Sequence, residues 1–106
     1  MGSIHLVCRD RLNLNRAATP DAWESGFWDI PKDQAAQLVG GMIYLHQKKS
    51  DRSYFGGRID GFQEVDTNLA HGGKIVFAFT FSGEARDARW RGGDHPRAWS
   101  SGVVND

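Results

Sequence analysis

Apolar residues alternate with smaller or polar residues most regularly over residues 74–81. The apolar and mostly aromatic positions are Ile75, Phe77, Phe79 and Phe81. Because successive side chains of a β-strand point to opposite faces of a sheet, this spacing predicts a strand that carries all four side chains on one face.

Two segments upstream of this strand also have the composition of strands. Met42–His46 is a short apolar run rich in strand formers. Residues 54–65 are expected to be extended too, although Gly56-Gly57 and Gly61 interrupt them. Glycines inside a strand predict a bulge, a bend or the close approach of another backbone.

Two short helices are predicted before these strands. Thr19-Pro20-Asp21 has the residues of a helix start, namely a capping hydroxyl, a proline at the first helical position and an aspartate favoured by the helix dipole. This helix is expected to end near Gly26. A second helix is predicted from Pro31 through residues 32–39, ending at Gly40-Gly41, where glycine can take the left-handed conformation. Helices this short are not stable alone, so both are expected to pack on a sheet.

Together these elements predict an α+β fold in a single domain covering residues 1–106. A chain of 106 residues is long enough for one hydrophobic core and too short for two. Glycine pairs at 40–41, 56–57, 72–73 and 92–93 lie near expected boundaries or bends. Because strands outnumber helices, we expect a small curved mixed β-barrel, or a strongly curved sheet, with short peripheral helices.

The charge of the chain is balanced but unevenly distributed. Thirteen basic residues stand against thirteen acidic ones, which excludes the strong positive field of a protein that coats nucleic acid. Any anionic partner must therefore be contacted locally. Residues 46–58 form a basic segment whose cations are Lys48, Lys49, Arg52 and Arg58.

The numbers and positions of the cysteine, histidine and apolar residues argue against a disulfide-bonded, membrane-spanning or metal-binding protein. The single cysteine, Cys8, allows no internal disulfide, and no apolar run approaches the length of a membrane span. With no signal-peptide pattern, we expect a cytoplasmic protein that does not contact a membrane. The histidines are too scattered for metal-ligand spacing, and the glycine pairs lack the spacing of a dinucleotide or Walker-type loop, so neither metal nor cofactor is expected.

Aromatic residues lie beside polar and basic residues in several segments. This suits the stacking of a nucleobase next to phosphate-binding cations, although the same rings would equally serve as the core of a small domain. The loop over residues 48–54 combines cations with hydroxyls, which suits phosphate contact or simple solvation. Residues 86–99 carry four arginines and two tryptophans. These arginines either bind phosphate or stack on Trp90 and pair with Asp87 and Asp94.

Residues 39–47 (VGGMIYLHQ) and 55–62 (FGGRIDGF) resemble the PUA-like superfamily, especially its EVE and ASCH branches. In those families a helix leads through a glycine-bearing turn into an apolar strand, and a loop then leads into a glycine-containing strand. The resemblance implies a compact β-barrel with peripheral helices and a ligand pocket between strands. EVE-like domains read modified bases, whereas some ASCH-like domains act on RNA or on nucleoside-type substrates.

The resemblance also implies which residues line that pocket. Trp28 and Phe55 would supply ring faces, and Ser53 and His46 would supply hydrogen bonds to a base edge. The whole set implied at the pocket is Trp28, Tyr44, His46, Ser53, Tyr54 and Phe55.

The leading hypothesis is a small binding module, rather than an enzyme, that recognises a nucleobase or modified nucleotide in DNA or RNA. An aromatic pocket would hold the base, and the phosphates would be contacted by Lys48, Lys49, Arg52 and Arg58. One alternative is a small hydrolase acting on RNA or a nucleoside-like metabolite, with His46 or His95 as acid or base. Another is a protein-interaction or accessory subunit whose exposed aromatics meet a partner.

Overall fold

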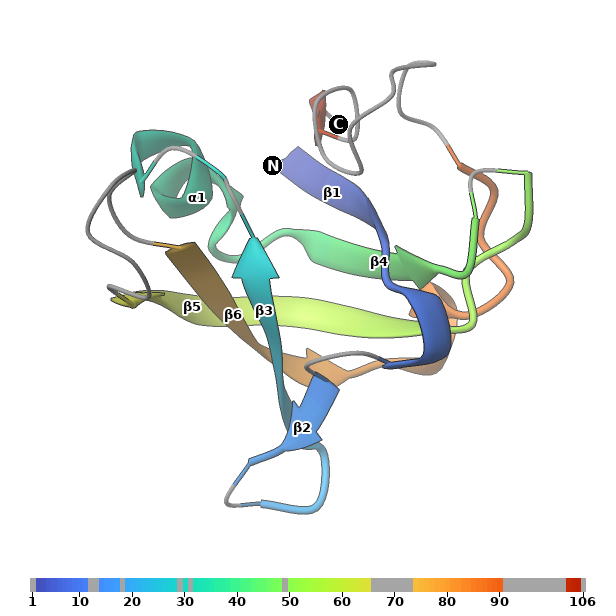
Figure 1. Ribbon diagram of the computed structural model, residues 1–106, viewed down its shortest axis with the longest axis horizontal. Helices are drawn as coiled ribbons and strands as arrows, with labels where there is room; N and C mark the ends of the chain where they lie inside the picture. Colours follow the sequence, from blue (N-terminus) through green and yellow to red (C-terminus); the bar gives the residue numbers. More distant parts are fainter. Residues whose placement is uncertain are drawn as a thin grey trace.

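The computed structural model describes residues 2–11, 14–17, 19–28, 30, 32–48, 50–65, 74–90 and 103–105. Within these residues seven strands form one sheet in the order β2-β3-β6-β5-β4-β1-β7 (Figure 1). The strands are β1 (Gly2–Val7), β2 (Leu14–Arg16), β3 (Ala22–Trp28), β4 (Met42–His46), β5 (Phe55–Val65), β6 (Lys74–Phe81) and β7 (Val103–Asn105). The helical elements are α1 (Lys32–Leu38) and the 3₁₀ turns η1 (Arg9–Arg11) and η2 (Gly83–Ala85). The predicted α+β class is confirmed.

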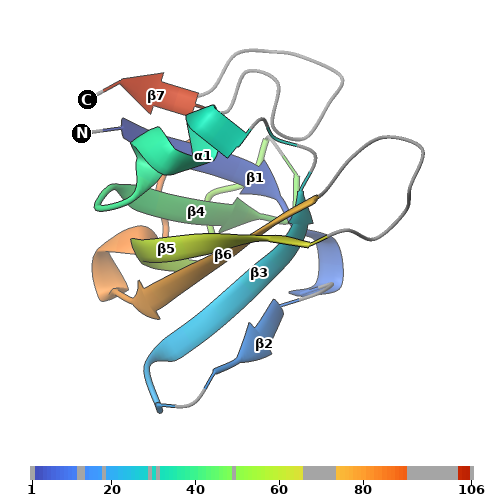
Figure 2. The same ribbon diagram turned by 90° about the vertical axis from the view of Figure 1, so that its left-hand side faces the viewer.

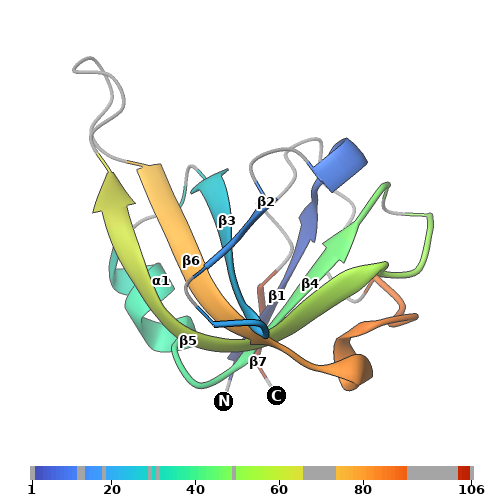
Figure 3. The ribbon, with the colours of Figure 1, turned by 90° about the horizontal axis from the view of Figure 1, so that it is seen from below.

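The sheet is mixed and strongly bent. β1 runs parallel to β4, and the other paired strands run antiparallel. Figure 3 shows the two halves of the sheet curving toward one another. Arg11, at the end of the η1 turn that follows β1, places its guanidinium carbon 5.8 Å from the ring centre of Trp23 on β3, although β1 and β3 are four places apart in the strand order. Among the described residues, the two edge strands β2 and β7 do not pair with each other, so this part of the sheet is not closed into a barrel.

The hydrophobic core fills the inside of this curve. The alternation predicted over residues 74–81 is confirmed, because Ile75, Phe77 and Phe79 are fully buried on one face of β6. Helix α1 packs against β1 and β5 and buries Ala35 and Leu38 (Figure 2). Burial of a large apolar side chain stabilises the fold by roughly 1.5–3 kcal/mol. The other core side chains from the sheet include Ile4, Leu6, Ile43, Leu45, Phe55 and Ile59.

The helix predicted from Thr19 to Gly26 is wrong. Ala22–Trp28 is strand β3, which pairs with both β2 and β6. The Ala22 N–H donates to the Thr19 carbonyl at 3.1 Å, so residues 19–22 form the turn between β2 and β3. Proline is favoured at the second position of such a turn as well as at a helix start, so the local sequence fits both structures. The pairing of residues 22–28 with the aromatic strand β6 makes this segment a strand.

The second predicted helix is confirmed as α1. It ends where predicted, because the Gly41 N–H donates to the Leu38 carbonyl at 2.9 Å and Gly40 takes a φ of 90°. A residue with a Cβ is strained at that φ, which explains the glycine. Strand β1 was not predicted from the sequence.

The glycine-interrupted segment is confirmed as one long strand, β5. Its register against β6 shifts between Ile59 and Gly61, so the predicted irregularity is present. Gly56 has a φ of 156°, and a Cβ placed on it would collide with the Ile43 carbonyl oxygen of β4. Glycine at this position therefore allows β4 and β5 to approach closely.

Several predicted features lie outside the described residues. They are the glycine pairs at 72–73 and 92–93, Lys49, His95, and the part of the arginine-rich segment after Trp90. Within the described part of the chain, no helix has the length and apolar character needed to cross a membrane.

Candidate functional site

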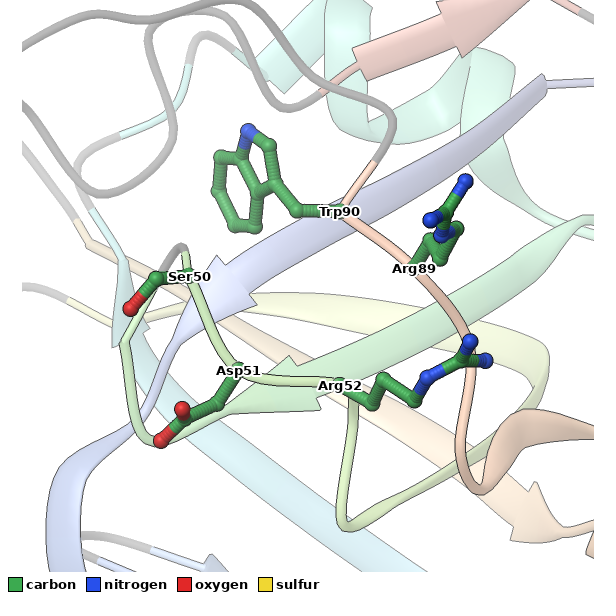
Figure 4. Close-up of a pocket in the computed structure, with 5 residues that line it drawn as sticks. All are labelled: Ser50, Asp51, Arg52, Arg89 and Trp90. Carbon is green, nitrogen blue, oxygen red and sulfur yellow. The ribbon is translucent and has the colours of Figure 1, made fainter.

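Two segments that the sequence singled out line one hollow. The loop over residues 50–52 and residues 89–90 border a hollow with a volume of about 380 Å³. The residues that line it are Ser50, Asp51, Arg52, Arg89 and Trp90 (Figure 4), and we call it the Trp90 hollow. Figure 4 shows the indole of Trp90 on one side of its segment and the guanidinium of Arg89 on the other. The residues that line the hollow thus carry an aromatic ring, two guanidinium groups and one carboxylate.

Ser53 holds the two segments together. Its N–H donates to the Ala88 carbonyl at 2.8 Å, and its carbonyl accepts from the Asp87 N–H at 2.7 Å. Its hydroxyl donates to the Ala85 carbonyl at 2.6 Å and accepts from the Ala88 N–H at 2.8 Å. Ser53 is buried, so these bonds are protected from water. In this structure its hydroxyl bonds the chain's own backbone and positions residues 85–88.

Arg52 extends across the hollow to the second segment. One of its terminal nitrogens donates to the Asp87 carbonyl at 3.0 Å, and its Nε lies 3.7 Å from a carboxylate oxygen of Asp87. The two side chains are 55% and 80% exposed. An ion pair this exposed contributes only about 0–1 kcal/mol, so the Arg52 guanidinium can exchange this contact for an anion at small cost.

Trp90 packs against a cluster of aromatic rings formed by His5, Tyr44 and His46. His5 on β1 stacks on Tyr44 on β4, with ring centres 4.5 Å apart. Trp90 meets both histidines edge-on, with ring centres 5.7 Å from His5 and 5.1 Å from His46. Such edge-to-face pairs are worth about 0.5–1.5 kcal/mol beyond area burial. These contacts therefore fix the position of the Trp90 ring.

The hydrogen bonds of His46 determine the protonation of both buried histidines. Nδ1 of His46 lies 2.9 Å from the Asp51 carbonyl, which can only accept, so this nitrogen carries the proton. In a neutral ring Nε2 of His46 must then accept, and it lies 2.9 Å from Nδ1 of His5, which donates. This chain of bonds links β1 and β4 to the loop that lines the Trp90 hollow.

The environment of His46 favours the neutral form of its ring. Burial lowers its pKa below the usual 6.5, and the hydrogen bond to the Asp51 carbonyl and the Asp51 charge offset part of that effect. Protonation would place a second N–H where His46 now accepts from His5. An added proton therefore charges a buried ring, and the hydrogen bond between the two histidines is then kept only if His5 changes tautomer so that its Nδ1 accepts.

The structure places the other predicted site residues apart from this hollow. Phe55 points into the core face, because it pairs with Leu45 while Tyr44 pairs with Gly56. Trp28 pairs with Ile75 of β6, and Ile75 pairs with Glu64 near the end of β5, whereas Phe55 is the first residue of β5. The indole N–H of Trp28 donates to the Ser25 hydroxyl at 3.0 Å.

Tyr54 and the remaining cations also have defined positions. The Tyr54 hydroxyl donates to the Cys8 carbonyl at 2.6 Å, and burial raises the pKa of Tyr54. Burial likewise raises the pKa of the Cys8 thiol. Lys48 is exposed in the turn that precedes Asp51. Arg58 lines a separate hollow on the outer face of β5.

Of the predicted set, Arg52 lines the Trp90 hollow and His46 and Tyr44 lie in the ring cluster beneath it. Sequence reasoning missed His5, and it did not pair Arg89 and Trp90 with the 50–52 loop. The available signal for His5 was its position inside the apolar run over residues 4–8. Pairing the segments requires the long-range hydrogen bonds of Ser53, which no local pattern encodes.

The described residues contain no group of three or more histidine, cysteine, aspartate or glutamate side chains able to hold a metal ion. Comparisons with protein-family models, with curated proteins and with solved structures found no match.

Proposed function

We propose that this domain binds a nucleotide, free or within DNA or RNA, with the base on Trp90 and the phosphate on Arg52 and Arg89. The observation that carries the proposal is the placement of one half-buried indole and two exposed guanidinium groups around one hollow. Its volume of about 380 Å³ lies within the range of small-ligand sites.

The chemistry of each group matches a part of a nucleotide. An indole stacks on a base whatever its identity, and such stacking is worth about 1–3 kcal/mol per base. Guanidinium groups bind phosphate through paired, charge-assisted hydrogen bonds. The Asp51 carboxylate at the same hollow can accept from an amino group on the base edge. A modified base would be distinguished at that edge.

The hydrogen bonding of the site favours binding over catalysis. Both ring nitrogens of His46 are bonded within the protein, and the ring is fully buried. A general acid or base must reach the substrate with one of those nitrogens. We therefore do not assign His46 a proton-transfer role.

The relation to the PUA-like superfamily remains part of this proposal. It is supported by the α+β class, the strong curvature of a mixed sheet and the helix that leads through Gly40-Gly41 into β4. The proposal includes completion of a PUA-like barrel by the whole chain. An experimental structure in which the sheet edges remain apart across the entire chain would contradict this part.

Calorimetric titration with nucleoside monophosphates, unmodified and base-methylated, tests the proposal. Replacing Trp90 with alanine is expected to weaken binding roughly 5-fold or more through loss of stacking. Arg52→Ala combined with Arg89→Ala is expected to weaken it roughly 10-fold or more, because each guanidinium supplies charged hydrogen bonds.

Arg58→Ala is the matched control, since it removes an exposed arginine from the outer face of β5. It is expected to leave the affinity unchanged. If no nucleotide binds, or if Arg58→Ala weakens binding as much as the paired change, the proposal is wrong. Concentration-dependent self-association without nucleotide binding would favour a protein-interaction role instead.

A further inference from the structure

A second hollow with similar chemistry lies at the same end of the molecule. It has a volume of about 300 Å³ and brings together arginines from η1, β2 and the segment after η2 with rings from β3, β5 and β6. The residues that matter are Arg11, Arg16, Arg86, Trp23, Phe55 and Phe81. We call it the arginine–aromatic hollow.

Each arginine in this hollow lies over a ring. The guanidinium carbon of Arg16 is 5.1 Å from the ring centre of Trp23, and that of Arg86 is 5.0 Å from the ring centre of Phe81. Arg11 lies 5.3 Å from the ring centre of Phe55. Trp23 and Phe81 are half-buried, and all three arginines are exposed. The hollow therefore presents ring faces together with cations that can move from a ring to a phosphate.

The charge of the hollow favours an anion. Its lining contains three arginines and one acidic residue, Asp21. Among the ion pairs formed within the described residues, none involves these three arginines. The cations are thus held by rings rather than neutralised by carboxylates.

The two hollows are joined by one short segment. Arg86 lines the arginine–aromatic hollow, and Arg89 and Trp90 line the Trp90 hollow. The four residue-to-residue steps from Arg86 to Trp90 span at most about 14 Å even when fully extended. Ser53 fixes this segment at its middle through Asp87 and Ala88. Figures 1 and 3 show η1, the loop before β5 and the segment after β6 at the same end of the molecule.

We propose that the ligand is a single-stranded nucleic-acid segment of about two to four nucleotides that occupies both hollows, an inference that rests on the proposed function. A stacked strand advances about 3.4 Å per nucleotide and an extended strand more, so a separation of up to about 14 Å corresponds to that length. One base lies on Trp90, the phosphates pass along Arg52, Arg89 and Arg86, and a later base meets Trp23 and Phe81. Alternating rings and guanidinium groups are how single strands are bound without a base-paired partner.

The test is a length series measured with the full chain. Fluorescence anisotropy or calorimetry compares uridine and thymidine monophosphates with the corresponding oligomers of two, three, four and six nucleotides. The affinity is expected to rise roughly 10- to 100-fold up to about four nucleotides, because additional bases stack, and then to level off. Arg16→Ala combined with Arg86→Ala is expected to lower tetranucleotide affinity roughly 10-fold and to change mononucleotide affinity by less than about 2-fold.

Lys32→Ala, which removes an exposed cation from α1, is the control for general charge effects and is expected to change neither affinity. Urea unfolding of each variant establishes that the fold is retained. If mononucleotides bind but affinity does not rise with length, the two-hollow inference is overturned while the proposed function stands. If neither nucleotides nor oligomers bind, both are overturned, and binding of an acidic phosphopeptide in their place would assign the hollows to a protein partner.

Discussion

Nδ1 of His5 lies 2.9 Å from Nε2 of His46, joining two buried imidazoles that are 41 positions apart in the chain. The other nitrogen of His46 bonds the Asp51 carbonyl, so the pair connects the β1–β4 ladder to the wall of the Trp90 hollow. A buried pair of this kind is sensitive to protons, because only the neutral form of His46 can accept from His5. Protonation of His46 is therefore expected to affect the stability of the fold.

Stability is expected to fall as the pH drops below about 6.5. The folded-state pKa of His46 is lower than its unfolded value of 6.5, so the unfolded chain binds more protons in the window between the two values. The free energy of unfolding therefore rises with pH through that window, and above the window the contribution of neutral His46 no longer changes with pH. Urea unfolding at a series of pH values measures this slope.

His46→Asn is the informative variant for the pH effect. The asparagine amide can donate to the Asp51 carbonyl but does not titrate. The variant should show a shallower dependence of stability on pH between pH 6.5 and the folded-state pKa of His46, because the titrating imidazole is gone. An unchanged slope would show that His46 does not carry the effect.

Replacing Ser53 with alanine should destabilise the protein by about 1–3 kcal/mol. The change leaves the Ala85 carbonyl and the Ala88 N–H without the hydroxyl that each bonds now. Amide chemical shifts over residues 85–90 are expected to move as that segment loosens. Ser50→Ala, at an exposed position of the same loop, is expected to stay within about 0.5 kcal/mol of the parent. Equal losses of stability at the two serines would contradict the role of the Ser53 hydrogen bonds in holding residues 85–88 in place.

Gly56 and Gly61 on β5 are expected to respond differently to alanine. Gly56 has a φ of 156°, and its added Cβ meets the Ile43 carbonyl oxygen, so Gly56→Ala should cost about 2 kcal/mol or more. Gly61 has open space at that position, and Gly61→Ala should be neutral or stabilising by up to about 1 kcal/mol. Thermal unfolding of both variants decides this, and a larger loss at Gly61 would contradict the described approach of β4 and β5.

The dependence of oligonucleotide binding on salt should be shallow. Two to four phosphate contacts on a single strand correspond to a slope of about −1.4 to −2.8 in a plot of log affinity against log salt concentration. The balanced charge of the chain adds no general attraction to that figure. Titrations between low and physiological salt measure the slope, and a value steeper than about −5 would indicate a far larger basic surface than the two hollows provide.

The strands β4, β5 and β6 and helix α1 could be predicted because their signals are local. Alternation in β6, the apolar run of β4 and the glycines after α1 each act over a few residues. Strand β3 was misread because Thr19-Pro20-Asp21 serves a turn as well as a helix start. The deciding interaction is pairing with Phe77 and Phe79, which are more than fifty residues away in the chain.

The candidate site was predicted only in part. Local composition pointed to the basic loop and to the arginine-rich segment, and Arg52 does line the Trp90 hollow. It did not show that these segments meet, because their contact depends on the buried Ser53. Trp28 and Phe55 were expected to share one pocket, but strand register separates them by nine residues along β5, from Phe55 to Glu64 opposite Ile75.

An NMR titration of labelled protein with a tetranucleotide shows directly whether the strand binds at the Trp90 hollow. The indole N–H signals report on each tryptophan separately, so Trp90 can be compared with Trp28 at the far end of the sheet. If the strand binds there, the signals of the Trp90 indole and of the amides of Asp51, Arg52 and Arg89 are expected to shift with a common affinity, while the Trp28 indole signal does not move. Shifts centred on Trp28, or none at saturating tetranucleotide, would contradict binding at the Trp90 hollow.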